Sequence, residues 1–242
     1  MGTTAAAILG TAAPRRLYVG VAVLAIAMAA VGFWPTYFGP LLAGGVDKPA
    51  IIHFHAAVYV GWLALFLTQV TLASTGRVAA HMRLGRIAIG YGVVVIVAGL
   101  IAAFGMFALR VHAGDMVAAQ RQLVGPLLDM FVFAPVFAAA IYYRRKPELH
   151  KRLMILATTS LLIAAVARMP FFGQPRNVLL IQLVWSTPIL VAMAHDLWRH
   201  RRVSAIYALG LVVLALEGPA MRNAVRDTEA WGAVAAWLAA RV

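Results

Sequence analysis

The chain alternates long apolar runs with short polar loops. Seven of the runs are long enough to cross a bilayer, because an α-helix rises about 1.5 Å per residue and the hydrocarbon core is about 30 Å thick. This pattern predicts an all-α integral membrane bundle of about seven transmembrane helices, in a single domain over residues 1–242. The predicted spans are residues 17–38, 50–73, 87–109, 124–143, 152–170, 177–198 and 203–221.

Both ends of the chain add to this pattern. The first run follows Arg15 and Arg16 and is longer than the apolar core of a signal peptide, so we expect a retained helix. Residues 227–242 carry Trp231 and Trp237 among small apolar residues, which indicates an additional helix lying in the membrane interface.

Composition supports a membrane protein. Hydrophobic residues make up 63% of the chain and charged residues 12%, which excludes an ordinary soluble globule. The formal net charge is +13, but most Lys and Arg lie in short loops between apolar runs. We therefore expect contacts with anionic lipid head groups and no nucleic-acid binding. The chain has no Cys, so thiolate metal sites are excluded.

The basic residues also predict an orientation. They are concentrated in the loops after the second, fourth and sixth spans, near residues 77, 145 and 201. Basic loops of multi-span proteins stay in the cytoplasm, so the pattern predicts a cytoplasmic N-terminus and an external C-terminus.

Four of the ionisable residues inside the predicted spans stand out: His55, Asp129, Arg168 and Glu217. Charge in hydrocarbon costs at least a few kcal/mol, so such groups are usually paired or functional. Because neighbouring spans run in opposite directions, all four are expected in the same outer third of the membrane.

The second span carries the strongest pattern. His55, Tyr59, Trp62 and Phe66 recur at helical spacing and form one polar and aromatic stripe. His53 precedes this stripe, and a His-x-His pair at a helix start suits metal ligation, because imidazole is the commonest metal ligand at neutral pH. The predicted cofactor-binding residues are His53, His55, Tyr59, Asp129, Arg168 and Glu217, and the predicted metal ligands are His53, His55, Asp129 and Glu217.

Several functions are compatible with these groups. Iron, zinc or manganese suits two imidazoles with two carboxylates, and haem or a quinone would give the site a redox or cofactor-handling role. The same groups can relay protons in a proton-coupled transporter. A purely structural arrangement would pair Asp129 with Arg168 and hydrogen-bond Glu217 to His55. The absence of a complete catalytic motif also fits an accessory subunit of a larger membrane complex.

The remaining histidines near the basic loops have a simpler expected role. We expect these residues to meet lipid phosphates and to cap helices, because Arg and Lys surround them. They are His81, His150, His195 and His200.

Short runs in the chain resemble an uncharacterised family of bacterial multi-span membrane proteins. The runs are HFHAA from His53, HMRLG from His81, the pair Asp129 and Met130, and RRKPELHKRLM from Arg144, followed by Arg168. The resemblance covers roughly residues 50–200 and implies the bacterial inner membrane, without an activity. More distantly, HKRLM from His150 is similar to a run in small four-span proteins implicated in cytochrome oxidase assembly.

Overall fold

The computed structural model describes residues 4–172 and 177–242, and for residues 4–16 only the helical backbone. Its helices are α1 (Thr4–Phe33), the π-helix η1 (Trp34–Phe38), α2 (Gly39–Leu42), α3 (Ala50–Ser74), α4 (Val78–His112), α5 (Met116–Tyr142), the 3-10 helix η2 (Tyr143–Arg145), α6 (Pro147–Ser160), α7 (Ile163–Val166), the 3-10 helix η3 (Pro170–Phe172), α8 (Val178–His200), α9 (Ala205–Glu217), α10 (Pro219–Arg226) and α11 (Glu229–Ala239).

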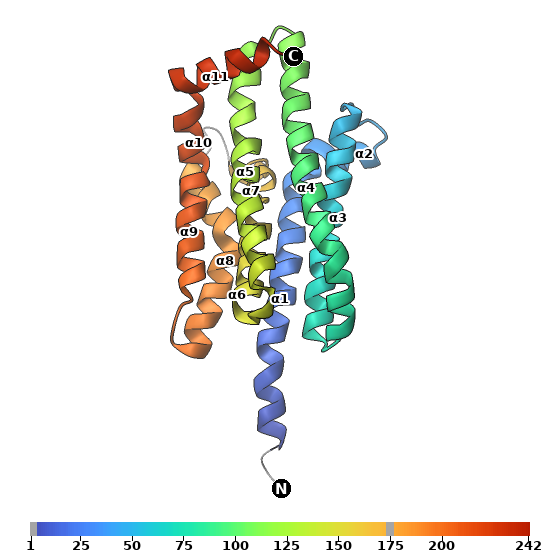
Figure 1. Ribbon diagram of the computed structural model, residues 1–242, viewed down its shortest axis with the longest axis vertical. Helices are drawn as coiled ribbons and strands as arrows, with labels where there is room; N and C mark the ends of the chain where they lie inside the picture. The colour runs from blue at the N-terminus through green and yellow to red at the C-terminus, as the bar shows by residue number, and fades with distance from the viewer. Residues whose placement is uncertain (1–3, 173–176) are drawn as a thin grey trace.

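Seven helical segments are long and apolar enough to cross a membrane, which confirms the predicted all-α bundle of seven spans (Figure 1). They are Leu17–Leu42, Ala50–Ser74, Val78–His112, Met116–Arg145, Pro147–Val166, Val178–His200 and Ala205–Arg226. The fourth span begins earlier than predicted because Asp115 caps it, accepting a hydrogen bond from the backbone N–H of Ala118 at 3.0 Å.

The fifth span is broken where a continuous helix was predicted. The backbone carbonyl of Thr159 accepts a hydrogen bond from Nε1 of Trp185 at 2.7 Å, and α6 ends at the next residue, Ser160. A side-chain donor that enters the carbonyl ladder commonly interrupts a helix. The chain resumes as the single turn α7.

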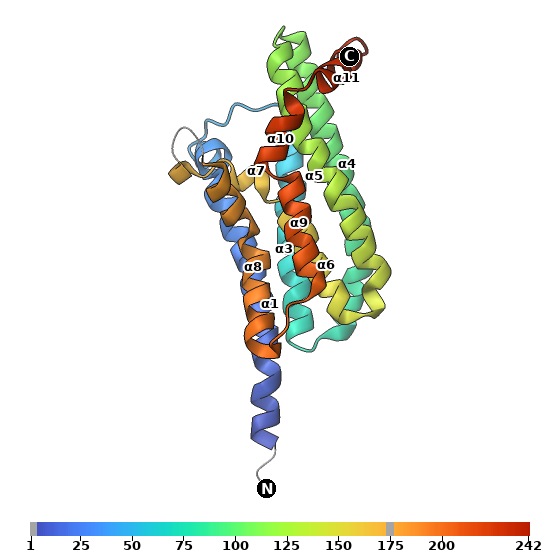
Figure 2. The same cartoon turned by 90° about the vertical axis from the view of Figure 1, so that its left-hand side faces the viewer.

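This fifth span also lies at the centre of the bundle. In its most apolar stretch 61% of the residues are buried, compared with 39% or less in the other six spans. Helix α6 packs against α5, α8 and α9, while α1, α3 and α4 complete the surrounding bundle (Figures 1 and 2). Lipid tails are as apolar as these side chains, so close packing rather than water exclusion holds the helices together.

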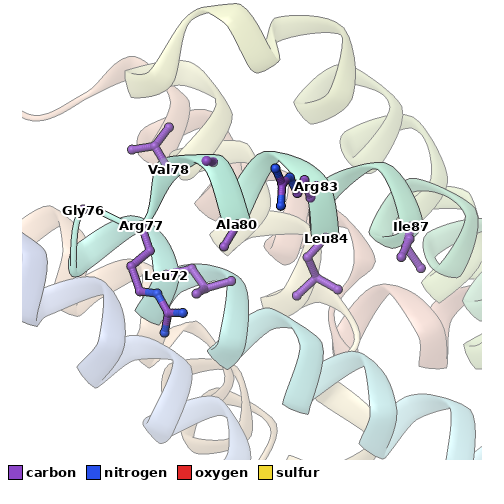
Figure 3. Close-up of a pocket in the computed structure, with 9 residues that line it drawn as sticks. Leu72, Gly76, Arg77, Val78, Ala80, Arg83, Leu84 and Ile87 are labelled. Atoms are coloured by element: carbon purple, nitrogen blue, oxygen red, sulfur yellow. The ribbon is translucent and has the colours of Figure 1, made fainter.

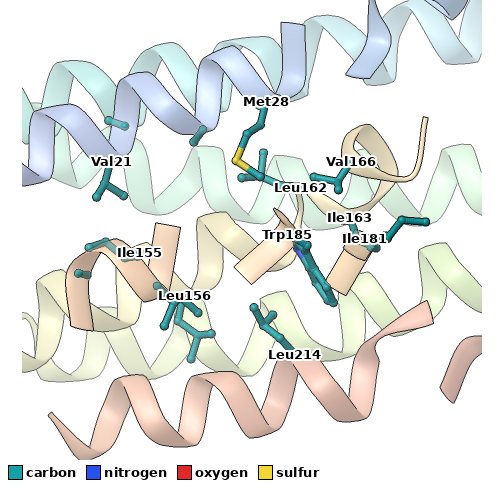
Figure 4. Close-up of a cluster of buried hydrophobic side chains, with 14 of the residues drawn as sticks. Val21, Met28, Ile155, Leu156, Leu162, Ile163, Val166, Ile181, Trp185 and Leu214 are labelled. Atoms are coloured by element: carbon teal, nitrogen blue, oxygen red, sulfur yellow. The ribbon is translucent and has the colours of Figure 1, made fainter. Parts of the chain in front are cut away.

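The main core forms where four helices meet around α6. Figure 4 shows Met28 of α1, Leu156 of α6, Trp185 of α8 and Leu214 of α9 in one buried cluster. Trp185 and Leu214 are completely buried. This core separates the two polar clusters described below.

The predicted helix after the last span is confirmed as α11. It packs against α5, where Nε1 of Trp231 donates to the backbone carbonyl of Gln120 at 2.8 Å, and Ala235 is completely buried. Its place in a membrane interface stays a prediction.

The bundle has two chemically different ends. We call the end that carries the turns at residues 75–77, 143–146 and 201–204 the basic end, because Arg and Lys gather there. The opposite end, where α11 lies across the top of the bundle in Figure 1, is called the far end. The assignment of the basic end to the cytoplasm stays a prediction.

Candidate functional site

Two carboxyl groups and one guanidinium meet in the half of the bundle nearer the far end. Asp129 comes from α5, Glu217 is the last residue of α9, and Arg222 comes from α10. Nη2 of Arg222 donates to Oδ1 of Asp129 and to Oε1 of Glu217, the latter at 2.9 Å. We call Asp129, Glu217 and Arg222 the far-end cluster.

The break between α9 and α10 turns Arg222 back onto Glu217. Gly218 adopts an extended conformation, with φ −65° and ψ 175°, and Pro219 starts the next helix without an N–H to offer. The side-chain Nε of Arg222 supplies a donor instead, at 2.7 Å from the backbone carbonyl of Glu217. One guanidinium therefore caps α9 and neutralises charge at the same place.

The far-end cluster is buried and its charges do not balance. The side chain of Glu217 is 1% exposed, and those of Asp129 and Arg222 are 14% exposed. Among the residues that the structure describes, none hydrogen-bonds to Oε2 of Glu217. Two ionised carboxylates beside one cation would leave a net negative charge in apolar surroundings, which is costly.

Tyr59 of α3 lies next to this cluster. Its hydroxyl is 3.5 Å from the backbone oxygen of Val95 and 3.7 Å from the sulfur of Met130, the neighbour of Asp129. Gly99 of α4 makes the space, because a Cβ at that position would lie 2.6 Å from the Tyr59 hydroxyl oxygen. Tyr59 therefore contacts the residue that follows Asp129, and its predicted role in cofactor binding stays a prediction.

His55 extends the group of polar side chains along α3. Its ring stacks on Tyr59 with 4.0 Å between the ring centroids, and it reaches toward the backbone of Ala98 in α4. Both Asp129 and Arg168 are close enough to act on the imidazole electrostatically. His55 thus lies at the edge of the predicted site, while its Nδ1 is buried without a partner among the described residues.

The other two predicted residues face different neighbours. Nδ1 of His53 lies 2.9 Å from the hydroxyl of Tyr37, in the π-helical end of the first span. Arg168 is exposed, with its guanidinium 5.3 Å from the centroid of the Phe33 ring and a hydrogen bond of 2.5 Å to the backbone oxygen of Ala164. Neither belongs to the far-end cluster.

The structural pairing predicted from the sequence was wrong in its partners. Asp129 was expected to pair with Arg168, and Glu217 to bond to His55; in the structure both carboxyl groups bind Arg222. Arg222 was missed because it follows the predicted end of the seventh span. The sequence signal was the Gly-Pro pair directly after Glu217, which interrupts the helix between Glu217 and Arg222.

The predicted metal ligands do not form one group. In the described ranges, 4–172 and 177–242, no three His, Cys, Asp or Glu side chains are placed to hold a metal ion together. Binding of a metal, haem or quinone therefore stays a prediction.

A second polar cluster lies toward the basic end, and the sequence did not predict it. Nη2 of Arg152 in α6 is 3.1 Å from Oδ2 of Asp196 in α8, and its Nη1 is 2.9 Å from Oε2 of Glu148. Lys151 also binds Glu148, at 2.5 Å, and the Arg152 guanidinium lies 5.7 Å from the centroid of the Tyr207 ring. We call Glu148, Lys151, Arg152 and Asp196 the basic-end cluster.

Two histidines near the basic end link helices. Nδ1 of His81 is 3.3 Å from the backbone oxygen of Gln69, and Nδ1 of His150 is 2.8 Å from that of Ala140. Each histidine stands at the start of a helix and contacts the helix before it. For these two residues the structure shows a hydrogen bond within a helical hairpin, and the predicted lipid contact stays a prediction.

A shallow hollow of about 690 Å³ lies at the turn from α3 to α4, at the basic end and away from the far-end cluster (Figure 3). Leu72, Leu84 and Ile87 give it an apolar lining, and Arg77 and Arg83 add positive charge. This chemistry matches a phospholipid better than a polar metabolite. Lipid contact here stays a prediction.

Comparisons with protein-family models, with curated proteins and with solved structures gave no match to this chain. The resemblance drawn from the HFHAA, HMRLG and HKRLM runs therefore stays a prediction.

Proposed function

We propose that this chain moves protons across a membrane and that the carboxyl group of Glu217 is its proton-binding group. The observation that supports this proposal is Oε2 of Glu217, which has no hydrogen-bond partner among the described residues and belongs to a buried carboxyl that shares Arg222 with Asp129. A proton on Oε2 balances the charge of the cluster. Ionisable groups buried in membrane bundles commonly serve ion and proton pathways.

The geometry gives each member of the far-end cluster a task. Asp129 remains ionised and holds Arg222 in place, while Glu217 alternates between a neutral acid and a carboxylate bound to the same guanidinium. When the proton leaves Oε2, Arg222 stabilises the charge that remains. His55 contacts Tyr59, whose hydroxyl lies beside Met130, the neighbour of Asp129, and an imidazole can accept and release a proton near neutral pH.

The proposed setting is the bacterial inner membrane with the basic end in the cytoplasm. The far-end cluster then faces the outer half of the bilayer. Protons would enter it from outside under the usual electrochemical gradient.

Proton flux in vesicles tests the proposal. The purified protein is reconstituted into liposomes that contain a pH-sensitive dye, and a potassium gradient with valinomycin imposes a membrane potential. We expect potential-driven acidification above that of empty liposomes, and we expect Glu217→Gln to remove it, because the amide cannot exchange a proton.

The matched control is Glu229→Gln, which removes the same charge from an exposed residue of α11. It should conduct like the parent protein. Flux equal to that of empty liposomes in the parent protein, or unchanged flux in Glu217→Gln, would contradict the proposal.

The other predicted functions have their own test. A cofactor protein would purify with a visible absorption band or a stoichiometric metal, and an accessory subunit would co-purify with larger subunits in mild detergent. Either result together with absent flux would replace proton movement as the account of this chain.

A further inference from the structure

Helix α9 carries one buried stripe that runs between the two polar clusters. Its buried residues are Tyr207, Gly210, Leu214 and Glu217, at intervals of three, four and three. This spacing places them on one face of the helix. At about 1.5 Å per residue the stripe spans about 15 Å from Tyr207, beside the basic-end cluster, to Glu217.

Polar side chains continue inward from Glu217 along α8. A Cβ on Gly218 would lie 2.2 Å from Oε1 of Gln182, so this amide rests against the residue that follows Glu217. Nε2 of Gln182 donates to the hydroxyl of Ser186 at 3.4 Å, one turn deeper. Ser186 is 5% exposed and therefore lies inside the bundle.

An apolar layer then closes the interface. A Cβ on Gly210 would lie 3.1 Å from a methyl carbon of Leu156 and 3.5 Å from one of Ile189, so α9 approaches α6 and α8 closely there. Leu214 and Trp185 lie beside Leu156 in Figure 4. Ser186 and Asp196 are separated by ten residues of α8, so the layer is about 15 Å thick. The side chains of Leu156, Ile189 and Leu214 that fill it cannot carry a proton.

Beyond this layer the basic-end cluster meets the surface. An open hollow of about 260 Å³ reaches Arg152 and Asp196, and it is also lined by His200, Arg202 and Ser204. Asp196 is 3% exposed, yet it is in contact with a hollow that opens at the basic end. Its carboxylate lies 3.1 Å from the guanidinium of Arg152.

We propose that the interface of α6, α8 and α9 is the proton path, that Asp196 is its release site at the basic end, and that the apolar layer at Gly210 is its gate. This inference rests on the proposed function of Glu217. A proton leaves Oε2 of Glu217 for water that the polar groups of Gln182 and Ser186 would hydrogen-bond, and this water carries it across the layer when Leu156 and α9 separate. It then binds a carboxylate oxygen of Asp196 and leaves from there to water in the hollow.

The same liposome assay tests the path with substitutions outside the far-end cluster. Asp196→Asn removes the proposed release site and should lower potential-driven flux by at least about a hundredfold, the usual range for losing a positioned proton carrier. Leu156→Ala shortens the side chain that faces Gly210 and should raise flux. The control for this change is Leu209→Ala, an equal truncation on the exposed face of α9, which should leave flux unchanged.

The outcomes separate the two proposals. Absent flux in the parent protein overturns the function of Glu217 and this path together. Flux that Glu217→Gln removes, but that Leu156→Ala leaves equal to Leu209→Ala, overturns the path alone. If Asp196→Asn does not fold, the flux of Leu156→Ala compared with that of Leu209→Ala still tests the proposed path. Raised flux in Leu156→Ala alone supports the path.

Discussion

The two polar clusters share a plan and differ in their charge. Each places one guanidinium between two carboxyl groups. At the basic end one of these, Glu148, is 64% exposed and also binds Lys151, so two cations face two anions. In the far-end cluster two carboxyl groups face one cation, with the side chain of Glu217 1% exposed and that of Asp129 14% exposed.

This difference in charge indicates which of the two clusters should bind a proton. A cluster with equal numbers of cations and carboxylates can keep every group ionised, because opposite charges close together favour the charged forms. A buried cluster with one carboxylate in excess either keeps an uncompensated charge, which is unfavourable in free energy, or binds a proton. The comparison therefore assigns the neutral acid to Glu217 and an ionised carboxylate to Asp196.

Loss of Arg222 should have the largest effect on stability. Arg222→Met leaves Asp129 and Glu217 buried without their cation, and breaking a buried ion pair from one side typically costs about 3–5 kcal/mol. Unfolding in a detergent–SDS titration measures this change. Adding Asp129→Leu to the variant should recover most of the loss, because one protonated carboxyl is neutral. A double variant no more stable than Arg222→Met would contradict the interpretation that the cluster holds one carboxyl group more than it has cations.

Neutralising Asp196 should lower the free energy of unfolding by less than the loss of Arg222, but by a measurable amount. Asp196→Asn keeps the shape and removes the charge that balances Arg152, and hydrogen bonds to charged groups contribute about 1.5–3 kcal/mol. The same titration measures it, with Asp47→Asn as the exposed control. A variant as stable as the parent protein would mean that Asp196 is not ionised.

Neutralising Glu217 should lower the free energy of unfolding by less than neutralising Asp196, although Glu217 is the more buried of these two residues. Glu217→Gln resembles the protonated acid, so we expect a loss below about 1 kcal/mol, within the value of one ordinary hydrogen bond. A loss equal to or greater than that of Asp196→Asn would reverse the comparison and place the ionised carboxylate at the far end.

The smallest effect is expected at Glu148. Its side chain is 64% exposed, and exposed ion pairs contribute about 0.2–1 kcal/mol. Glu148→Gln should therefore change unfolding by a few tenths of a kcal/mol, and 0.5 M salt should remove most of that difference. A large loss would show that the basic-end cluster is as closed to water as the far-end cluster.

The sequence predicted the spans well because apolar length is a local property. Seven apolar runs of sufficient length predicted the seven spans. Counting residues along each span also predicted that Asp129 and Glu217 lie at the same depth, and in the structure both bind Arg222. Depth follows from counting residues along each helix. The break after Ser160 could not be predicted, since it depends on Trp185 arriving from a different helix.

Which side chains pair at a given depth in the bundle depends on how each helix is rotated about its own axis. A single sequence does not give that rotation. Arg168 and Arg222 were both near the depth of Asp129, but only Arg222 turns toward it, through the break at Gly218. Asp196 was overlooked for a related reason, because its ion pair with Arg152 joins separate helices.

Infrared difference spectroscopy on the reconstituted protein tests the central claim most directly, because the C=O stretch of a protonated carboxylic acid is separate from the bands of a carboxylate. At neutral pH we predict a protonated-acid band in the parent protein that is absent from Glu217→Gln and retained in both Asp196→Asn and Glu229→Gln. A spectrum in which Glu217→Gln removes no such band, or in which Asp196→Asn removes it, would contradict the assignment of the proton to Glu217.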